Sequence, residues 1–327
     1  MPHSTFASRR RFPLAASLLA LSALLLAPVA ASLAQDDDAE PVKKDVPYVP
    51  TPQEVVDKMI EMAEIKEGDI VYDLGCGDGR MIVTAAKKHG ARGIGVDIDP
   101  QRIRESNENA KKADVTDKVK FIQKDLFTMD FKDCDALCMY LLPSVNLKLR
   151  PKILELKPGT RIVSHAFDMD DWEADETVDV DGRTVYKWVV PAKVDGTWTA
   201  ELKGEGGKPQ RAKLNLKQEF QKVSGTADVG GKKVEIKDAK LKGDQLTLAL
   251  DSGDKPVEYV IRVNGGQMQG QARAADGADN AQQASASFKA TREGGAPKSN
   301  ANEKEQDSEK EEASEKEEAS EKEAVKN

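Results

Sequence analysis

The sequence predicts an α/β domain with a mostly parallel sheet, followed by a small antiparallel β domain and a charged tail. Between about residues 51 and 193, apolar strand candidates alternate with helix candidates, which is typical of a parallel sheet with helices on both faces. Over roughly residues 195–292, apolar residues recur at every second position, which indicates short, half-buried strands. Residues 293–327 contain no aromatic residue.

The composition limits the class of protein. With 327 residues the chain has room for about two domains, and its formal net charge is −8. Because sequence-independent binding of nucleic acid needs clustered positive charge, we expect no nucleic-acid partner. The three cysteines (Cys76, Cys134 and Cys138) and the three histidines show no metal-ligand spacing, so no metal site is expected.

Residues 1–34 are typical of an export signal. Three arginines at positions 9–11 precede the apolar run Leu14–Ala31, and Ser32–Ala34 has the small-x-small pattern of a cleavage site. The stretch Ser8–Phe12 resembles the twin-arginine signal, which exports folded proteins. We therefore expect a protein of the periplasm or cell envelope. An ordinary secretory signal is one alternative, and an uncleaved signal that anchors the chain in the membrane is the other.

A linker, residues 35–50, leads into the α/β domain at 51–193. The first helix of the α/β domain is predicted to begin at Thr51–Glu54, because Thr-Pro-Gln-Glu is a capping box with proline at the first helical position. Strands and helices then alternate along the chain. The strand candidates are Asp69–Leu74, Gly93–Ile98, Val119–Lys124, Asp135–Leu141 and Arg161–Phe167. The helix candidates between them are Arg80–Lys88, Pro100–Lys112 and Leu147–Leu156.

The remaining patterns predict antiparallel strands and then a tail. Glu176–Val180 and Thr184–Pro191 flank Asp-Gly, a two-residue hairpin signal. About eight short strands follow over residues 195–292, and they predict a meander that is closed as a small barrel or folded as a sandwich. Residues 293–327 repeat the letters SEKEEA and cannot bury enough apolar surface to order themselves. We expect a disordered tail, with a solvated helix as the alternative.

The candidate site begins at Asp73–Arg80, where a strand candidate ends and a helix candidate begins. Glycines at positions 75, 77 and 79 let the backbone turn sharply and let a ligand approach the main chain. The spacing is not the GxGxxG of dinucleotide sites, and no Gly-Lys-Ser/Thr follows as in a P-loop. A structural turn without a ligand is the simpler alternative.

Acidic residues end the next two strand candidates. Asp97, within Gly-Val-Asp-Ile-Asp, stands where a carboxylate can accept from both hydroxyls of a ribose. Asp125 follows the next strand candidate and can accept from an adenine amino group. One such acid is usually an ordinary turn residue. Three in register, counting Asp73, beside a glycine loop indicate a nucleoside-binding cleft.

The motifs Asp-Leu-Gly-Cys-Gly-Asp-Gly-Arg, Gly-Val-Asp-Ile-Asp and Lys-Asp-Leu, with the final hairpin, resemble those of class I methyltransferases. The resemblance covers about residues 45–193. It implies a Rossmann-like sheet of seven strands and S-adenosylmethionine as the cofactor. Asp73 would face the amino group of the cofactor, Asp97 its ribose and Asp125 its adenine. The same motifs imply cofactor contacts from Gly75, Cys76, Gly77, Gly79, Ile98 and Leu126.

A narrower resemblance begins before the first helix. Pro47–Pro52, which reads Pro-Tyr-Val-Pro-Thr-Pro, and the Asp-Gly-Arg that ends at Arg80 resemble a bacterial group related to mitochondrial lysine methyltransferases. Those enzymes act on membrane-protein targets, which implies a protein, and specifically a lysine amine, as the methyl acceptor. In that group the Tyr-Val-Pro-Thr/Ser segment lies over the cofactor, which implies lid roles for Tyr48 and Thr51. A Pro-rich linker entering a capped helix is the alternative.

Candidate catalytic residues follow the fourth and fifth strand candidates. Tyr140 begins Tyr-Leu-Leu-Pro and could orient an acceptor through its hydroxyl, or be a core tyrosine. His165 is the only histidine near the predicted ligand-side strand ends, where it could act as general base or be a structural residue. The acids at 168, 170 and 171 could attract a cationic acceptor or form a solvated loop. The Asp/Asn-Pro-Pro-Tyr/Phe motif of amino-N methyltransferases is missing after the fourth strand candidate, which counts against adenine or glutamine as acceptor.

Functions from different classes remain open at this point. The glycines and the three acids favour methyl transfer to a protein side chain or a small molecule. The export signal favours an envelope binding protein, whose β domain holds a partner and whose α/β domain is a scaffold, because S-adenosylmethionine is made in the cytosol. Aminopropyl transfer from a related cofactor is a third interpretation, but no acidic polyamine motif stands out.

Overall fold

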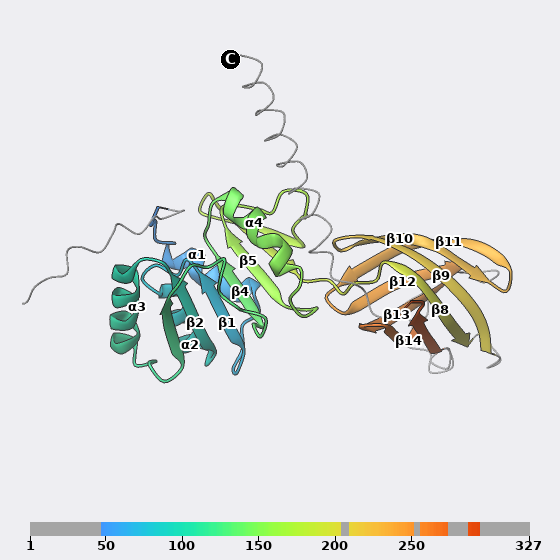
Figure 1. Ribbon diagram of the computed structural model, residues 1–327, viewed down its shortest axis with the longest axis horizontal. Helices are drawn as coiled ribbons and strands as arrows, with labels where there is room; N and C mark the ends of the chain where they lie inside the picture. Colours follow the sequence, from blue (N-terminus) through green and yellow to red (C-terminus); the bar gives the residue numbers. More distant parts are fainter. Residues whose placement is uncertain (1–46, 204–208, 252–255, 274–286, 295–327) are drawn as a thin grey trace, which may run out of the picture. The chain divides into compact units, whose positions relative to one another are not determined.

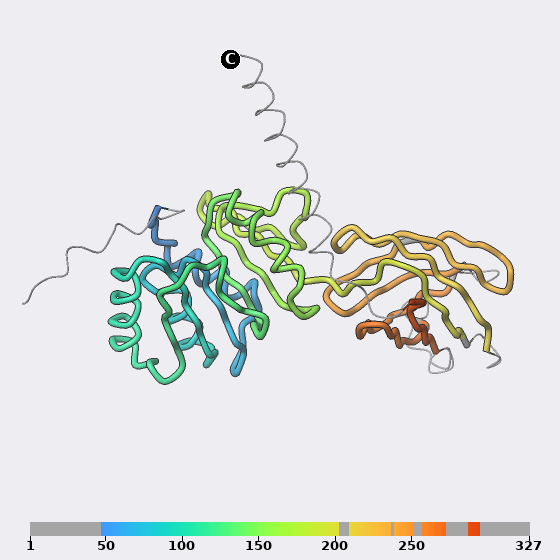
Figure 2. Tube along the Cα trace, viewed as in Figure 1, coloured from blue at the N-terminus to red at the C-terminus, as the bar shows by residue number. Residues whose placement is uncertain are grey.

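The computed structural model of the protein describes residues 47–203, 209–251, 256–273 and 287–294. These residues form a seven-stranded sheet with helices on its faces and a closed barrel of eight strands (Figure 1). Figure 2 shows that the chain completes the sheet before it enters the barrel. The expected export signal, most of the expected linker and nearly all of the expected tail lie outside the described residues.

The sheet has the strand order β3-β2-β1-β4-β5-β7-β6. Its strands are β1 (Ile70–Leu74), β2 (Arg92–Asp97), β3 (Val119–Gln123), β4 (Ala136–Met139), β5 (Arg161–His165), β6 (Glu176–Val180) and β7 (Arg183–Val189). The first five run parallel, and β7 lies antiparallel between β5 and β6. The predicted seven-stranded, Rossmann-like sheet is confirmed. Its strand order reverses between β1 and β4, and ligands of open α/β sheets bind at such a crevice.

Helices cover both faces of the sheet. They are α1 (Gln53–Met62), α2 (Arg80–His89), α3 (Pro100–Ala113) and α4 (Pro143–Ile153). One face is packed against Ile60 of α1 and Ile82 of α2, and the other against Leu149 and Ile153 of α4. Each of these side chains is at most 1% exposed, and burying one contributes roughly 1.5–3 kcal/mol. Among the described helices, none combines the length and the apolarity needed to cross a membrane.

The start of α1 differs from the predicted capping box. The helix begins at Gln53, its N-cap residue is Pro52, and no side chain caps it. The main-chain oxygen of Pro52 instead accepts from Val55 and Val56 at 3.1 and 3.0 Å. The hydroxyl of Thr51 is therefore free of the helix, and it bonds a distant strand as described below.

The start of α4 lies earlier in the chain than the sequence predicts. The helix begins at Pro143 rather than at Leu147, and it ends at Ile153 rather than at Leu156. Proline at the first helical position has its φ angle already set and has no N–H to leave unpaired. The four residues before the predicted start, Pro143–Asn146, therefore form the first helical turn, and α4 follows directly on Tyr140-Leu141-Leu142.

The second part of the chain is a closed antiparallel barrel. Its strands are β8 (Gly196–Lys203), β9 (Pro209–Glu219), β10 (Lys222–Val229), β11 (Lys232–Lys242), β12 (Gln245–Asp251), β13 (Pro256–Asn264), β14 (Gln267–Arg273) and β15 (Ser287–Arg292). Each strand pairs with the next, and β15 pairs with β8 to close the ring. Of the two predicted arrangements, the barrel is confirmed and the sandwich is wrong.

Side chains fill the interior of the barrel. Trp198, Leu214, Ile261 and Phe288 are each 0% exposed and belong to one apolar cluster. Burial alternates along β9, whose odd-numbered residues from 211 to 219 are exposed. This alternation is the period-2 pattern of the sequence, and an eight-stranded barrel is just wide enough for its inward side chains to fill it.

A glycine in the barrel allows a test of this packing. A Cβ at Gly270 would lie 2.3 Å from the main-chain oxygen of Val260 and 2.8 Å from the Cα of Ile261. Gly270→Ala should therefore destabilise the protein by about 2–4 kcal/mol, because backbone rather than side chain would have to move. At Gly266 no atom lies within 4 Å, so Gly266→Ala is a matched control that should change stability by about 0.5 kcal/mol or less. Urea unfolding followed by tryptophan fluorescence measures both, and equal midpoints for the two variants would contradict the packing.

Candidate functional site

A pocket opens where the strand order reverses, at the carboxyl ends of β1, β2 and β4. With its open mouth included, it encloses about 1020 Å³. The structure brings most of the predicted site residues together there. Those that line the pocket are Tyr48, Thr51, Asp73, Gly75, Cys76, Gly77, Asp97, Ile98, Asp125, Leu126 and Tyr140. Gly79 and His165 lie outside its lining.

The glycine turn between β1 and α2 forms the floor of this pocket. Gly75, Gly77 and Gly79 have φ angles of 79°, 54° and 76°, in the left-handed region that favours glycine. The main-chain N–H groups of Gly75 and Cys76 both donate to the oxygen of Val96 in β2, at 2.8 and 3.0 Å. The turn is thereby tied to the end of the neighbouring strand, and it leaves main chain rather than side chains facing the pocket.

Asp73 is the buried acid of the site. It stands in β1 just before the glycine turn and is 7% exposed. Burial, and then the negative charges of Asp97 and Asp78, raise its pKa to about 8. Near neutral pH this carboxyl group therefore holds a proton for much of the time. A cationic group that enters the pocket beside it would favour the ionised form.

Asp97 ends β2 and is held in one orientation by main-chain donors. Its Oδ2 accepts from the N–H of Gly77, and its Oδ1 accepts from the N–H of Asp99, both at 2.9 Å. Burial raises the pKa of Asp97, although these two hydrogen bonds oppose the effect. Each carboxylate oxygen has a second lone pair, so the fixed carboxylate can still accept from a pair of ligand hydroxyls.

Asp125 lies past the end of β3 in an exposed position. Its Oδ1 accepts from the N–H of Phe127 at 2.8 Å, which fixes the turn that follows the strand. Ile98 follows Asp97 in the sequence, and Leu126 follows Asp125. Both apolar residues line the pocket. This end of the pocket therefore combines apolar walls with a carboxylate at the rim, which suits a flat heteroaromatic ring with an amino group.

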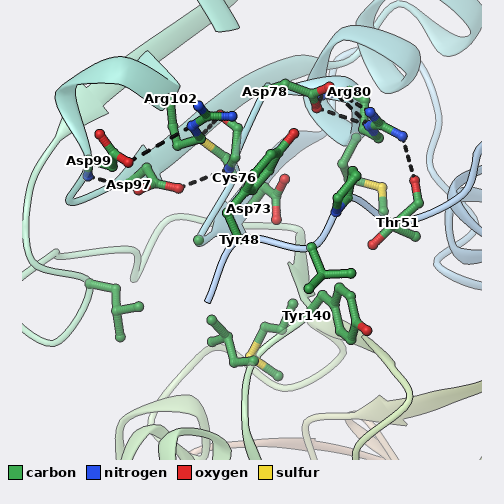
Figure 3. Close-up of a pocket in the computed structure, with 18 of the residues that line it drawn as sticks. Tyr48, Thr51, Asp73, Cys76, Asp78, Arg80, Asp97, Asp99, Arg102 and Tyr140 are labelled. Atoms are coloured by element: carbon green, nitrogen blue, oxygen red, sulfur yellow. Dashed lines mark hydrogen bonds and ion pairs between the residues drawn. The ribbon is translucent and has the colours of Figure 1, made fainter. Parts of the chain in front are cut away.

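The segment Pro47–Pro52, which we call the strap, crosses the pocket. Figure 3 shows the Tyr48 ring lying among Asp73, Cys76 and Arg102. The guanidinium carbon of Arg102 lies 4.3 Å from the centre of that ring. A Cβ on Gly77 would lie 2.5 Å from the ring, so the missing side chain is what lets Tyr48 cover the turn.

Thr51 fastens the other end of the strap. Its main-chain oxygen accepts from Nη1 of Arg80 at 2.8 Å. The same guanidinium grips the carboxylate of Asp78, through Nε at 2.9 Å and Nη2 at 2.6 Å. Burial alone would raise the pKa of Asp78, but this bidentate pair lowers it overall. The strap is thus joined to the glycine turn through one arginine.

Tyr140 follows β4 on the side of the pocket away from Asp97 and Asp99 (Figure 3). His165 ends β5 and is 3% exposed. The two rings lie 4.0 Å apart between their centres and are inclined by 38°. Of the two residues predicted as catalytic, only Tyr140 therefore lines the pocket, and His165 lies behind it.

Sequence reasoning missed several residues of the pocket. Arg102, which contacts the Tyr48 ring, lies in the first turn of α3. The one sequence signal for its place near the pocket is that it follows the helix-starting Pro100 by two residues. Met139 and Leu141 flank Tyr140 and line the wall. Arg80 was quoted within the motif, but its bond to the strap carries no sequence signal. In the described ranges, no three His, Cys, Asp or Glu side chains are arranged to hold a metal ion.

Comparison with known proteins places this pocket in a family. The family model described as the ANTKMT methyltransferase domain matches residues 73–176. A protein-lysine N-methyltransferase of Saccharolobus islandicus is 45% identical over 151 residues, which are 44% of this chain and 94% of that protein. The adenine nucleotide translocase lysine N-methyltransferase of Mus musculus is 30% identical over 168 residues, which are 51% of this chain and 67% of that protein.

Solved structures give a further similarity. An RNA methyltransferase from Salinibacter ruber, crystallised with S-adenosyl-L-homocysteine, is 52% identical. The match covers 45% of this chain and 96% of that one, with a TM-score of 0.44. In this relative, as in the archaeal protein, the similarity takes in nearly the whole of the other chain and less than half of this one.

The buried carboxyl of Asp73 allows a test of the electrostatics of the site. Its pKa is about 8 in the folded protein and ordinarily 3.8, so the unfolded chain loses this proton first. The stability of the wild type relative to Asp73→Asn should therefore be full below about pH 4 and fall by up to roughly 1.4 kcal/mol per pH unit towards pH 8. Urea unfolding at pH 5 and pH 8 measures this difference. Asp179→Asn, which removes an exposed carboxylate in β6, should keep the pH dependence of the wild type. A pH-independent difference between Asp73→Asn and wild type would contradict the buried neutral acid.

Proposed function

Because this chain belongs to the class I S-adenosylmethionine-dependent methyltransferases, in the ANTKMT methyltransferase family, we propose that it methylates the side-chain amine of a protein lysine. The observation that carries the proposal is the shared pocket: the glycine turn and three carboxylates face the same cavity as Tyr140 and Thr51. One cavity thus offers a cofactor end and an acceptor end. The similarity to protein-lysine N-methyltransferases supports the choice of acceptor.

S-adenosylmethionine is the methyl donor of this enzyme. In our proposal the glycine turn receives its methionine end, and Asp73 faces the ammonium group. The carboxylate of Asp97, held by two main-chain N–H groups, accepts from the ribose hydroxyls. Asp125 accepts from the adenine amino group, with Ile98 and Leu126 against the ring. Tyr48 then covers the bound molecule.

The reaction is a displacement at carbon that the protein assists by alignment. The lone pair of a neutral lysine amine attacks the methyl carbon, the carbon–sulfur bond breaks, and its electron pair stays on sulfur. The methylated ammonium ion then loses a proton to solvent. Lysine is ordinarily protonated at neutral pH, so an apolar approach that disfavours its charge helps the first step. Met139 and Leu141, beside Tyr140, supply such surroundings.

A different acceptor, RNA, is named for one similar solved structure. The net charge of this chain is −8, and five acids line the pocket against three basic side chains, Arg80, Arg102 and Lys124. A polyanion gains no attraction from such a surface, whereas a cationic lysine segment does. We therefore favour protein over RNA, and the experiment below separates them.

Binding of the cofactor should release a proton. The ammonium group of S-adenosylmethionine favours the ionised form of Asp73, whose pKa is about 8 without such a neighbour. The affinity should therefore rise roughly twentyfold between pH 6 and pH 7.5. Calorimetry at pH 7 in two buffers with different heats of ionisation counts the protons released. The wild type should release a substantial fraction of one proton, and Asp73→Asn should release almost none; equal release from both would contradict the assignment.

Methyl transfer to lysine can be measured directly. The full chain is incubated with S-adenosylmethionine labelled in its methyl group and a total protein extract, and the product is hydrolysed in acid. Labelled methyl-lysine is expected. Asp97→Asn should lower the yield of methyl-lysine at limiting cofactor by about tenfold or more, because the negative charge of the carboxylate that accepts from the ribose is lost. Asp179→Asn is the matched control on the surface and should be as active as the wild type.

Two outcomes would contradict the acceptor. Label that is released by ribonuclease rather than by protease would make RNA the substrate. Label in another amino acid would keep the methyltransferase and replace lysine.

A further inference from the structure

His165 is placed to act on the reaction without touching the reacting atoms. It is buried at the end of β5, and its ring lies behind Tyr140 rather than in the lining of the pocket. A general base must reach the proton that it removes, directly or through one water. The position of His165 instead gives it two partners that do line the pocket, Tyr140 and Thr51.

The first contact of His165 is with the strap. Its Nδ1 lies 3.2 Å from the hydroxyl of Thr51, across 114 positions of the sequence. Thr51 would cap α1 by the sequence pattern, yet the helix begins without a side-chain cap and the hydroxyl meets the histidine. Burial, followed by the charge of Arg183, lowers the pKa of His165, so the imidazole is neutral at neutral pH and one ring nitrogen can accept.

The second contact of His165 is with the wall of the pocket formed by Met139, Tyr140 and Leu141, which we call the acceptor wall. Tyr140 packs against His165 at a tilt of 38° and stacks on Phe167, whose ring centre lies 6.3 Å away at an angle of 20°. The residue between these two, Ala166, has a φ angle of 66°, which is costly for a residue with a side chain. Its N–H donates to Thr184 at 2.8 Å, and the Ser164 hydroxyl donates to the oxygen of Phe167 at 2.6 Å. The surrounding bonds thus hold a strained turn that presents both rings to Tyr140.

One imidazole therefore joins the two halves of the site. The strap is bound on the cofactor side through Arg80 and through Arg102. On the acceptor side it is bound through His165, which also backs Tyr140. A strap closed over the cofactor and a tyrosine facing the acceptor are in this way set by the same side chain.

We propose that His165 is a positioning residue, which fixes the strap through Thr51 and the acceptor wall through Tyr140 and takes no proton from the acceptor. This inference rests on the proposed methyl transfer. It identifies the residue that aligns the two substrates. Alignment of reacting groups is the main contribution that an enzyme makes to such a displacement, so a loosened wall lowers turnover more than it lowers cofactor binding.

The test is a double-mutant cycle on the full chain. Thr51→Val removes the hydroxyl, and His165→Phe keeps a ring against Tyr140 but removes Nδ1. Each should lower the rate of methyl incorporation into total protein about five- to tenfold at saturating cofactor, because one hydrogen bond is lost. The KM for S-adenosylmethionine should change less than twofold. The double variant should be no slower than either single one, since both remove the same bond.

Conservative variants separate positioning from proton transfer. Thr51→Ser keeps the hydroxyl, and His165→Asn keeps a polar atom near the place of Nδ1 but cannot serve as a base. Thr51→Ser should recover most of the rate that Thr51→Val loses. His165→Asn lacks the ring against Tyr140, so it should keep part of the wild-type rate but stay slower than Thr51→Ser. The pH–rate profile of His165→Asn should keep the shape of the wild-type profile, because the residue does not titrate in the mechanism.

Three results would overturn the proposal. They are an inactive His165→Asn beside a fully active Thr51→Val, losses that add in the double variant, and a cofactor KM that rises as far as the rate falls. Calorimetric affinity for S-adenosylmethionine shows whether each variant has folded around the cofactor site. Failure of the proposed function looks different: the wild type would then label no lysine, and the same cycle could be measured on whichever product it labels.

Discussion

The rest of the site depends on how the end of β2 holds the glycine turn. The oxygen of Val96 accepts from Gly75 and Cys76, and the carboxylate of Asp97 accepts from Gly77. Three successive N–H groups of the turn, at residues 75–77, are thereby satisfied by one neighbouring strand, which fixes the turn against β2. The acid that holds the turn is also the acid offered to the ligand. Any shift of β2 relative to β1 would therefore move the floor and one wall of the pocket together.

The part of the pocket formed by the glycine turn and the carboxylates could be predicted because its signals are local. Asp73, Gly77 and Asp97 lie at the ends of strands whose apolar runs are plain in the sequence, and a parallel sheet brings such ends to one edge. The barrel could be predicted for the same reason, since period-2 patterning identifies strands one at a time. Its closure could not, because whether β15 pairs with β8 depends on the sum of twists and offsets over eight strands.

The part of the pocket around Tyr140 could not be derived in this way. The bond of Thr51 to His165 and the stacking of Tyr140 join residues that no local pattern relates. Local rules pointed the other way at Thr51, where the capping box competes for the same hydroxyl and loses it to a tertiary contact. Before α4 two local signals disagree: the apolar repeat predicts a start at Leu147, whereas the helix begins at Pro143, a residue that starts helices well. Functional sites are where such conflicts between local and global preference are expected.

The stability of the barrel depends on its packed interior and little on which residues lie on its outer surface. Its interior holds packed side chains, and its strands form a ladder that leaves no unpaired edge around the ring. The outward positions of β9, such as Arg211, Lys213 and Lys217, contribute little to that interior. Exchanging them one at a time would leave the fold intact. The outward-facing residues of the barrel can therefore change without loss of its fold. The enzyme that precedes it in the chain keeps its own constraints.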